Sequence, residues 1–374
     1  MSEHECWMRR ALELARRAEG RTSPNPLVGA VIVRDGRVLG EGFHRRAGLP
    51  HAEAEALRAA HESVTSATMY VTLEPCSHYG RTPPCSEAIL SAGIAHVVYA
   101  VADPNPSAAG GGRRLREAGV QVTTGVCADE AEELNRFFLH AVRTGRPYVV
   151  AKYAASLDGR IAARSGDSKW ITGEAARNRA HELRHMVDAV VVGAGTVIAD
   201  DPSLTVRLAI DEPAHPLRVV LDSTGRTPLE CRLFSGELPG ATLVAATQTL
   251  PAEREAALAA RGVEVLRLPA DQHGRVDVTA LAQVLGARGV RSMMVEGGAA
   301  VHGAFFDANL VDEVWAFVAP VIIGGVAAPG PVGGRGAETM AEALRIGKLQ
   351  VESHGGDVLL RVRRMPPSPV AEGE

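Results

Sequence analysis

The sequence predicts an α/β protein of two domains. Its 374 residues exceed the usual size of one domain. In both halves, short apolar runs rich in β-branched residues alternate with stretches of helical periodicity. In the second half this pattern predicts a mainly parallel sheet covered by helices on both faces. Near the middle, Gly145 ends a helical stretch and Pro147 prevents its return, so we place the boundary within 143–147. The expected domains are 1–145 and 146–365, followed by a disordered tail over 366–374.

Composition and charge argue against several classes of function. Apolar residues make up 46% and charged residues 22% of the chain, as in ordinary soluble proteins. The formal net charge is −4 and no basic run is present, so we expect no nucleic-acid partner. The chain lacks an apolar stretch of about 18 residues and a signal-peptide core, which predicts no membrane partner and a cytoplasmic location. The chain has five cysteines, an odd number, and the scattered Cys6, Cys127 and Cys231 are expected to be free thiols in a reducing compartment.

The first half starts with an amphipathic helix and continues with alternating strands and helices. Apolar residues from Met8 to Ala15 share one face of that helix. Strands are expected at 28–33, 68–73 and 96–101. The segment 102–114 is rich in proline and glycine and predicts a loop. Asp129 and Glu132 have the spacing of a capping box and predict a helix that ends at Gly145.

The second half repeats this alternation with more strands. Buried strands are expected at 148–154, 189–193, 217–223, 242–247 and 292–298. Helices are expected at 174–187, 251–261, 279–287 and 299–309. The runs 313–320 and 358–364 complete the sheet, with an antiparallel arrangement as one option. In such a sheet, ligands should bind at the carboxyl ends of the parallel strands.

The most informative segment is 51–85, which contains HAEAEAL and VTLEPCSHYGRTPPC. It offers one imidazole and two thiols, from His51, Cys76 and Cys85, and these are ligand types of zinc. A catalytic zinc keeps its fourth position for water and lowers the pKa of that water to about 7. Glu53 stands two residues after His51, where it can act as general acid and base. The four residues predict zinc-dependent removal of an amino group from a nucleobase-like ring.

Local signals explain how these residues can converge. The strand over 68–73 ends just before Cys76, and two prolines delay the next helix until Cys85. A helix start favours the thiolate form of Cys85. Residues two apart do not share a helix face, so His51 and Glu53 can reach one atom only if His51 lies at the very start of its helix.

Two other interpretations of this segment are open. One is a capping histidine with two buried structural thiols. The other is a closed structural zinc site, with His78 as fourth ligand, beside a nucleotide-sensing domain; four protein ligands would then leave no position for water. Three evident ligands and the neighbouring Glu53 favour the catalytic interpretation.

Signals for phosphate binding occur in the second half. Gly193 and Gly195 follow a strand, but Ile198 stands where a dinucleotide fingerprint has its third glycine, so a tight turn explains them equally well. The run VEGGAAVHGAFFDANL is a stronger signal, because a buried strand ends in Glu296 and two glycines and a small-residue helix begins at once. Lys152, in an apolar strand, can bind a ligand or extend to solvent.

Together these motifs resemble one family, the bifunctional pyrimidine deaminase/reductases of riboflavin biosynthesis. The resemblance spans about residues 5–364 and is carried by SPNPLVGAVIV, GEGFHRRAGLPHAEAEAL, VTLEPCSHYGRTPPC, KYAASLDGRIA, SGDSKWITG, GAGTVIADDPSLTVR and VEGGAAVHGAFF. It implies an N-terminal cytidine-deaminase-like α/β/α domain followed by a dihydrofolate-reductase-like α/β domain. It also implies two reactions. An amino group is removed from a diaminopyrimidinone that carries a phosphoribosylamino group, and NADPH then reduces the ribosyl chain of the product to ribityl.

The resemblance also implies roles for individual residues. Zn²⁺ would be bound by His51, Cys76 and Cys85, with Glu53 moving protons. The first substrate would contact Asn25, His44 and Arg81. NADPH would be lined by Ala155, Trp170, Thr196, Asp200, Ser223 and Gly298. The phosphorylated substrate of the reductase would be lined by Lys152, Ser168, Arg184, Leu204, Arg207 and Glu296.

Several points stay open in the sequence. A zinc deaminase of a nucleoside or a tRNA base, with an accessory nucleotide-binding domain, is the alternative function. Lys152 and Asp200 both qualify as the proton source of the reductase step. The residue that would meet the 2′-phosphate of NADPH is not evident, so the sequence does not separate NADPH from NADH. We expect a small phosphoribosyl pyrimidine as the partner molecule and a homo-oligomer, because paired reductase domains are common in such folds.

Overall fold

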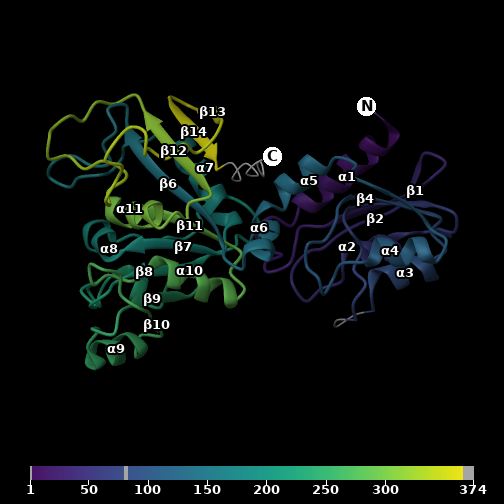
Figure 1. Ribbon diagram of the computed structural model, residues 1–374, viewed down its shortest axis with the longest axis horizontal. Helices are drawn as coiled ribbons and strands as arrows, with labels where there is room; N and C mark the ends of the chain where they lie inside the picture. Colours follow the sequence, from purple (N-terminus) through teal and green to yellow (C-terminus); the bar gives the residue numbers. More distant parts are fainter. Residues whose placement is uncertain (1, 80–82, 365–374) are drawn as a thin grey trace, which may run out of the picture. The chain divides into compact units, whose positions relative to one another are not determined.

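A computed structural model describes residues 2–79 and 83–364, and it divides into two compact units between Arg146 and Pro147 (Figure 1). Arg81 and the tail over 366–374, which both carry predictions, lie outside the described residues. Within that part of the chain, no helix combines the length and the apolar character needed to cross a membrane.

The first unit is a mixed sheet with helices on both faces (Figure 1). The strand order is β2-β1-β3-β4-β5; β1 is antiparallel to β2 and β3, whereas β3, β4 and β5 are parallel. The strands are β1 (Gly29–Arg34), β2 (Arg37–Phe43), β3 (Thr68–Leu73), β4 (His96–Val101) and β5 (Gln121–Thr124). The helices are α1 (Glu3–Arg16), α2 (Ala52–Ala59), α3 (Cys85–Ser91), α4 (Gly111–Glu117), α5 (Ala128–Leu134) and α6 (Arg136–Thr144).

Each face of this sheet has its own apolar core. On one face, Met8 of α1 and Phe138 of α6 cluster with Val98 of β4. On the other face, Ala56 of α2 and Leu115 of α4 belong to a second cluster. The unit is therefore a sheet between two helical layers, as the α/β/α prediction requires.

Strand β2 escaped prediction because its glycines resemble a turn signal. A Cβ atom on Gly40 would lie 2.3 Å from the carbonyl oxygen of Ala56, and one on Gly42 would lie 2.4 Å from the nitrogen of Ala56. Since both distances are impossible for real Cβ atoms, only glycine lets α2 lie directly on this strand. This close packing fixes the start of α2, which carries His51 and Glu53.

The predicted loop over 102–114 is wrong at its end. Helix α4 begins at Gly111, within that segment. The carboxylate of Glu74 accepts hydrogen bonds from the backbone nitrogens of Gly110 and Gly112 at 3.2 and 3.0 Å. Because the cap comes from 36 residues away, local sequence could not reveal the helix start.

The capping box predicted at Asp129 is also wrong. Helix α5 starts after Cys127, which has a left-handed backbone conformation and whose side chain makes no capping hydrogen bond. The single expected helix is divided at Asn135, whose side chain binds the backbone nitrogen and oxygen of Leu27 at 2.8 and 2.9 Å. A long-range contact therefore outweighs helix continuation at this position.

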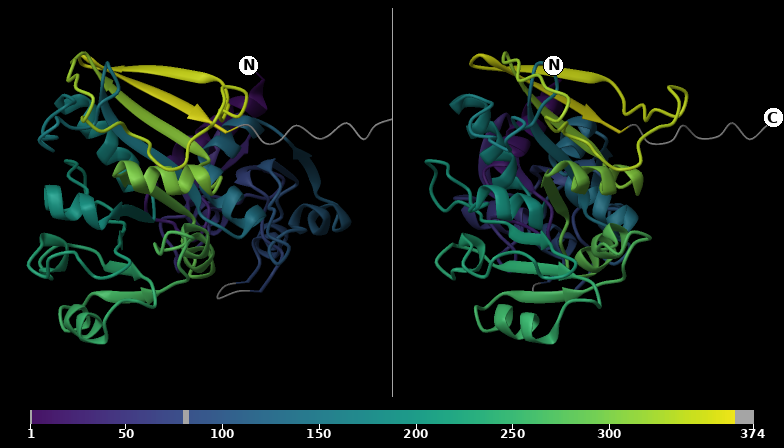
Figure 2. Two further views of the ribbon diagram at one scale, coloured as in Figure 1. Left: turned by 60° about the vertical axis from the view of Figure 1, so that its left-hand side comes forward. Right: turned by 90° about the vertical axis from the view of Figure 1, so that its left-hand side faces the viewer.

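The second unit is built on one sheet whose described strands run in the order β10-β9-β8-β7-β11-β6-β12-β14-β13. The strands are β6 (Tyr148–Ser156), β7 (Ala189–Gly193), β8 (Leu217–Leu221), β9 (Thr242–Ala246), β10 (Glu264–Arg267), β11 (Ser292–Gly297), β12 (Glu313–Ala319), β13 (Leu349–His354) and β14 (Asp357–Arg363). The helices are α7 (Glu174–Met186), α8 (Ala194–Asp200), α9 (Ala252–Ala259), α10 (Val278–Ala287) and α11 (Ala299–Asp307), with a 3₁₀ turn at Arg232–Phe234. Figure 2 shows this sheet extending from β10 (green) to the β13–β14 hairpin (yellow).

In this order, all neighbouring strands from β10 through β6 to β12 pair in parallel. The last two strands, β14 and β13, are each antiparallel to the strand before them. The antiparallel option for 313–320 is therefore wrong toward β6, to which β12 is parallel, and right toward β14. The short elements β10, β13 and α8 were not predicted. Because β7, β8 and β11 are parallel neighbours, the loops at their carboxyl ends gather Thr196, Ser223 and Gly298 at one edge of the sheet.

Candidate active sites

Three side chains of the types that bind metal ions meet in the first unit. His51 is the N-cap of α2, Cys76 follows β3, and Cys85 opens α3, as their local sequence signals predict. The ligand atoms of the three residues all lie within 4.8 Å of one another. His51 Nδ1 is 3.3 Å from the sulfur of Cys85 and 3.7 Å from that of Cys76. One imidazole nitrogen and two sulfurs at this spacing fit a zinc ion in size and in chemistry.

The two thiols of this cluster differ in acidity. Hydrogen bonding from Cys85 lowers the pKa of Cys76 against the opposing effect of burial, and His51 adds to the lowering. The same contact, together with burial, raises the pKa of Cys85, so these effects outweigh the preference for thiolate that was expected from its helix start. Cys76 is therefore the sulfur better prepared to receive a cation as thiolate, and a bound metal would displace the proton of the other.

Glu53 is a buried carboxyl group beside this cluster. Glu53 is only 4% exposed. Burial raises the pKa of its carboxyl group, and the nearby His51 partly opposes this rise. A carboxyl group whose pKa moves toward neutrality exchanges protons efficiently. Glu53 lines a cavity of about 210 Å³ together with His51 and Cys76, and we call it the Glu53 cavity.

Two further predicted residues lie in the Glu53 cavity. Asn25 and His44 are held together by a 3.1 Å contact between Nδ2 and Nε2. The other ring nitrogen of His44 is 3.0 Å from the carbonyl oxygen of Pro50, directly before His51. This chain of contacts presents polar groups to a ligand next to the cluster.

Sequence reasoning missed part of this wall. The cavity is also lined by Asp103 and Asn105, and by His78, which had been weighed as a metal ligand. Burial raises the pKa of Asp103, whose carboxylate accepts a 2.9 Å hydrogen bond from the nitrogen of Asn105. Both residues follow the carboxyl end of a parallel strand, and that rule could have identified them within the segment 102–114.

The second unit contains two adjoining cavities. The Lys152 cavity has a volume of about 410 Å³ and is lined by Lys152, Arg184, Arg207 and Glu296 among others. The Ser223 cavity has a volume of about 670 Å³ and follows the loops after β7, β8 and β11. The residues that line both cavities are Ile161, Ser168, Thr196, Asp200 and Gly298. This shared wall is where two bound molecules could touch.

A buried ion pair forms the floor of the Lys152 cavity. Arg184 donates to the carboxylate of Glu296 through Nε and Nη2 at 2.9, 2.6 and 2.8 Å, and the side chains are 9% and 10% exposed. Arg184 Nη1 also donates to the carbonyl oxygen of Thr205 at 2.7 Å. Burial alone would raise the pKa of Glu296, but Arg184 and Lys152 outweigh it and lower the pKa, so the carboxylate stays charged.

The remaining basic groups of this cavity are perturbed by burial and by one another. Burial lowers the pKa of Lys152, and Glu296 opposes the shift. Burial, with Arg184 and Arg207, lowers the pKa of His181 to about 4, so its Nδ1 stays an acceptor for the nitrogen of Arg207. Within the described chain, the guanidinium of Arg207 has no acidic partner, which leaves it available for an anion.

The residues predicted to line a dinucleotide separate into four groups by position. Thr196, Asp200 and Gly298 lie in the shared wall, where Asp200 accepts a 2.9 Å hydrogen bond from Ser168. Ser223 lines the Ser223 cavity. Trp170, 67% exposed beneath the guanidinium of Arg177, lines the Lys152 cavity. The buried Leu204, which was predicted to line the substrate, also lines the Lys152 cavity. Ala155 is buried in β6 opposite Val318 and is not among the residues that line these described cavities.

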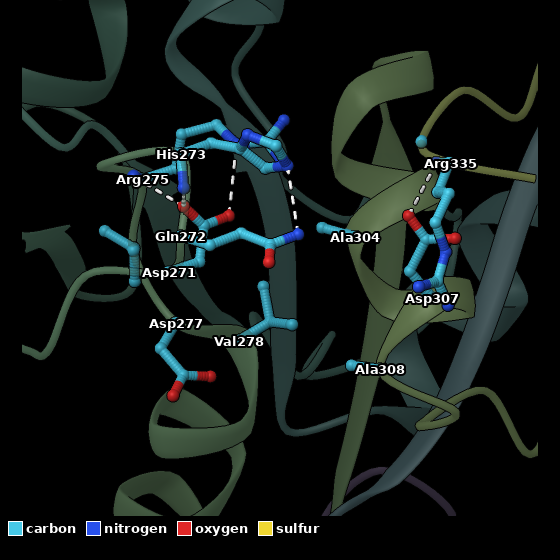
Figure 3. Close-up of a pocket in the computed structure, with 12 residues that line it drawn as sticks. Asp271, Gln272, His273, Arg275, Asp277, Val278, Ala304, Asp307, Ala308 and Arg335 are labelled. Carbon is cyan, nitrogen blue, oxygen red and sulfur yellow. Dashed lines mark hydrogen bonds and ion pairs between the residues drawn. The ribbon is translucent and has the colours of Figure 1, made fainter.

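A third cavity of about 890 Å³ adjoins the Ser223 cavity (Figure 3). Figure 3 shows Asp271 and Arg275 on one side of it and Asp307 of α11 on the other. The two cavities share Asp271, Arg275, Val276, Val278 and Ala304. The predicted site residues do not include any of these, because no local signal marks the loop over 271–278 as part of a binding site.

Comparisons with known proteins match both units. The model "Cytidine and deoxycytidylate deaminase zinc-binding region" matches residues 1–101, and the model "RibD C-terminal domain" matches residues 147–360. The chain is 45% identical to the riboflavin biosynthesis protein RibD of Bacillus amyloliquefaciens, over 95% of both chains. It is 43% identical to that of Escherichia coli, over 96% of this chain and 99% of the relative.

Solved structures give the same result. A RibD structure from Acinetobacter baumannii is 43% identical with a TM-score of 0.86, covering 97% of this chain and 99% of that one. A deaminase/reductase structure from Thermotoga maritima is 37% identical with a TM-score of 0.85 and the same coverage. The predicted fold class, a cytidine-deaminase-like unit followed by a reductase unit, is confirmed.

Proposed function

The chain belongs to the RibD family, and from this we propose that it catalyses two consecutive steps of riboflavin biosynthesis. The first is hydrolytic removal of an amino group from a diaminopyrimidinone bearing a phosphoribosylamino group. The second is reduction of the ribosyl chain of the resulting uracil to ribityl. The observation that carries the first step is the meeting of His51, Cys76 and Cys85 beside the buried carboxyl of Glu53. The alternative of a nucleoside or tRNA-base deaminase receives no comparable support from relatives that cover the whole chain.

In the deaminase unit, His51, Cys76 and Cys85 would hold Zn²⁺, which when bound supplies an acidified water as nucleophile. Glu53, whose raised pKa suits proton transfer, would carry one proton of the attacking water to the ring nitrogen and the other to the amine, which leaves as ammonia. Asn25 and His44 orient the ring through their polar groups in the Glu53 cavity. We propose, from its motif alone, that Arg81 contacts the same substrate.

In the reductase unit, the substrate occupies the Lys152 cavity and NADPH, the hydride source, occupies the Ser223 cavity. Arg207 binds the phosphate of the substrate, because its guanidinium is not committed to an acid in the described structure. Arg184 holds Glu296, which in turn stabilises the charge of Lys152. Ser168 and Leu204 complete the substrate wall, and Thr196, Asp200, Ser223 and Gly298 complete that of NADPH.

We assign proton delivery in the reductase step to Lys152. Burial lowers its pKa, which makes the ammonium a better acid, and the side chain faces the cavity that holds the ribosyl chain. Asp200 instead accepts a 2.9 Å hydrogen bond from the hydroxyl of Ser168, which suits a positioning role. We also propose that Ala155 and Trp170 contact NADPH, as their motifs imply. Trp170 lines the Lys152 cavity, so it would contact the cofactor where the two cavities meet at the shared wall.

A two-stage assay tests the proposed function. Ammonia release and NADPH oxidation are followed separately after the diaminopyrimidine phosphate is added. Glu53→Gln should lower ammonia release by roughly 10²- to 10⁴-fold, the usual contribution of a general acid and base, and should leave reduction of pre-deaminated substrate intact. Glu55→Gln, on the same helix, is the matched control and should retain both activities. Normal deamination by Glu53→Gln would refute the assignment.

We also propose that the protein self-associates through β13. This strand ends the described order of the sheet, and its Leu349 and Val351 are 49% and 62% exposed. An exposed edge strand with apolar side chains is a template for pairing with another strand. A second copy of the same strand, related by a two-fold axis, satisfies both edges at once.

A further inference from the structure

The two cavities of the second unit determine the direction in which a dinucleotide lies. Hydride transfer requires contact between the nicotinamide and the ribosyl chain. The Lys152 and Ser223 cavities share the wall formed by Ser168, Thr196 and Gly298, so the nicotinamide belongs at that wall. The adenosine half then extends to the opposite end of the Ser223 cavity. This step rests on the proposed reductase function.

That opposite end is built by two tied loops. The buried carboxylate of Asp222 accepts hydrogen bonds from the backbone nitrogens of residues 225–227 at 3.0, 3.0 and 2.7 Å. The hydroxyl of Ser223 accepts a 3.1 Å hydrogen bond from the nitrogen of Val276 in the other loop. Asp222 is therefore occupied as a loop anchor, and the backbone of Arg226 is fixed.

Two arginines line the Ser223 cavity at this end, and their surroundings differ. Arg275 is joined to the carboxylate of Asp271, with Nε 3.2 Å from Oδ2 (Figure 3). In the described part of the chain, the guanidinium of Arg226 has no carboxylate partner. Its Nη2 lies 3.8 Å from the place where a Cβ atom of Gly195 would stand, so it lies against the first turn of α8. One positive charge on this wall is thus not neutralised by a neighbouring acid.

We propose that Arg226 binds the 2′-phosphate of NADPH and thereby selects NADPH over NADH. The planar guanidinium can donate two parallel hydrogen bonds to a phosphate, whereas the 2′-hydroxyl of NADH offers no charge to it. The acids nearest the loop do not repel the phosphate strongly, because Asp222 binds three N–H groups and Asp271 binds Arg275. Arg226 acts on the cofactor alone and leaves the substrate wall untouched.

Direct nucleotide binding by the full chain tests this inference. Dissociation constants for NADPH and NADH are measured by fluorescence or calorimetry for the wild type, Arg226→Gln and Arg226→Lys. We expect Arg226→Gln to weaken NADPH by roughly 10- to 100-fold and NADH by less than about 3-fold, as loss of one charge-assisted contact implies. Arg226→Lys should keep most of the preference, because the charge remains. Arg275→Gln is the matched comparison and should lower the ratio by less than about 3-fold.

Three outcomes would overturn the inference. Equal weakening of both nucleotides by Arg226→Gln would mean that the arginine supports the loop without reading the phosphate. If Arg226→Gln leaves the ratio of the NADPH and NADH dissociation constants unchanged, or if Arg275→Gln changes this ratio more, another cation binds the phosphate. If the wild type binds neither nucleotide, the reductase function itself fails, and that result is distinct from binding without discrimination.

Discussion

Replacing Arg184 by methionine should destabilise the second unit by about 3 kcal/mol. The side chains of Arg184 and Glu296 are 9% and 10% exposed and share three short contacts. Breaking a buried pair from one side costs about 3–5 kcal/mol, because a charge is left uncompensated. Lys152 remains as a second cation toward Glu296, so we expect the lower end of that range.

Thermal unfolding of the full chain measures this effect, with hydrogen exchange assigning it to the second unit. For a unit of about 150–250 residues, each kcal/mol moves the Tm by about 2–4 °C, so the variant should melt about 6–12 °C lower. Arg232→Met removes an exposed pair with Asp201, at 67% and 48% exposure, and should cost less than about 1 kcal/mol.

The double variant Arg184→Met with Glu296→Leu separates pair energy from unpaired charge. Replacing both partners by apolar side chains removes the two charges of the pair, and Lys152, whose pKa burial already lowers, is then the charge left without its carboxylate, so the double variant should recover part of the loss. A single variant that loses less than about 1 kcal/mol would refute the reasoning. A double variant less stable than the single would refute it as well.

Three further predictions concern metal, pH and assembly. Chelation should increase hydrogen exchange within residues 51–85 and leave 147–364 unchanged, because the predicted ligands lie in the first unit; equal increases in both would contradict this. Burial lowers the pKa of His181 and His302 to about 4, below an unfolded value of about 6.5, so the unfolded state binds more protons between these values and stability falls as pH drops through this window, by about 1.4 kcal/mol per pH unit for each histidine. Urea unfolding against pH should show this slope, and His302→Gln should remove one histidine's share; an unchanged slope would exclude His302 as a cause. Val351→Lys should shift the mass measured by light scattering from oligomer toward monomer, and an unchanged mass would exclude β13 as the interface.

The first site could be read from the sequence because its geometry is local. A strand end, two prolines and two helix starts place His51, Cys76 and Cys85, and the residues that achieve this stand next to the ligands themselves. Asp103 was missed because it joins the same wall only through sheet pairing between β3 and β4. Proximity in the chain therefore decided which parts of the site were visible.

The second site was less predictable because its contacts are long-range. The family resemblance implied that Arg184 and Glu296 line the same substrate, but it did not reveal that they pair across 112 residues. This pairing commits Arg184 to a carboxylate and leaves Arg207 for the phosphate. Arg226 carried no signal at all. Its importance depends on Arg275 being occupied by Asp271, a fact that requires the folded loop.

Glu53 and Glu296 show how one side-chain type serves two purposes in this chain. Burial dominates at Glu53, so its pKa rises and the carboxyl takes up a proton more readily than an exposed one. At Glu296 burial acts in the same direction, but Arg184 and Lys152 outweigh it and the pKa falls, so the group stays charged and cannot serve as a proton donor. The two environments therefore predict different effects when each glutamate is replaced by glutamine. Glu53→Gln should remove proton transfer with little loss of stability, whereas Glu296→Gln should leave Arg184 and Lys152 without their counter-charge and should lower stability and the affinity for substrate together.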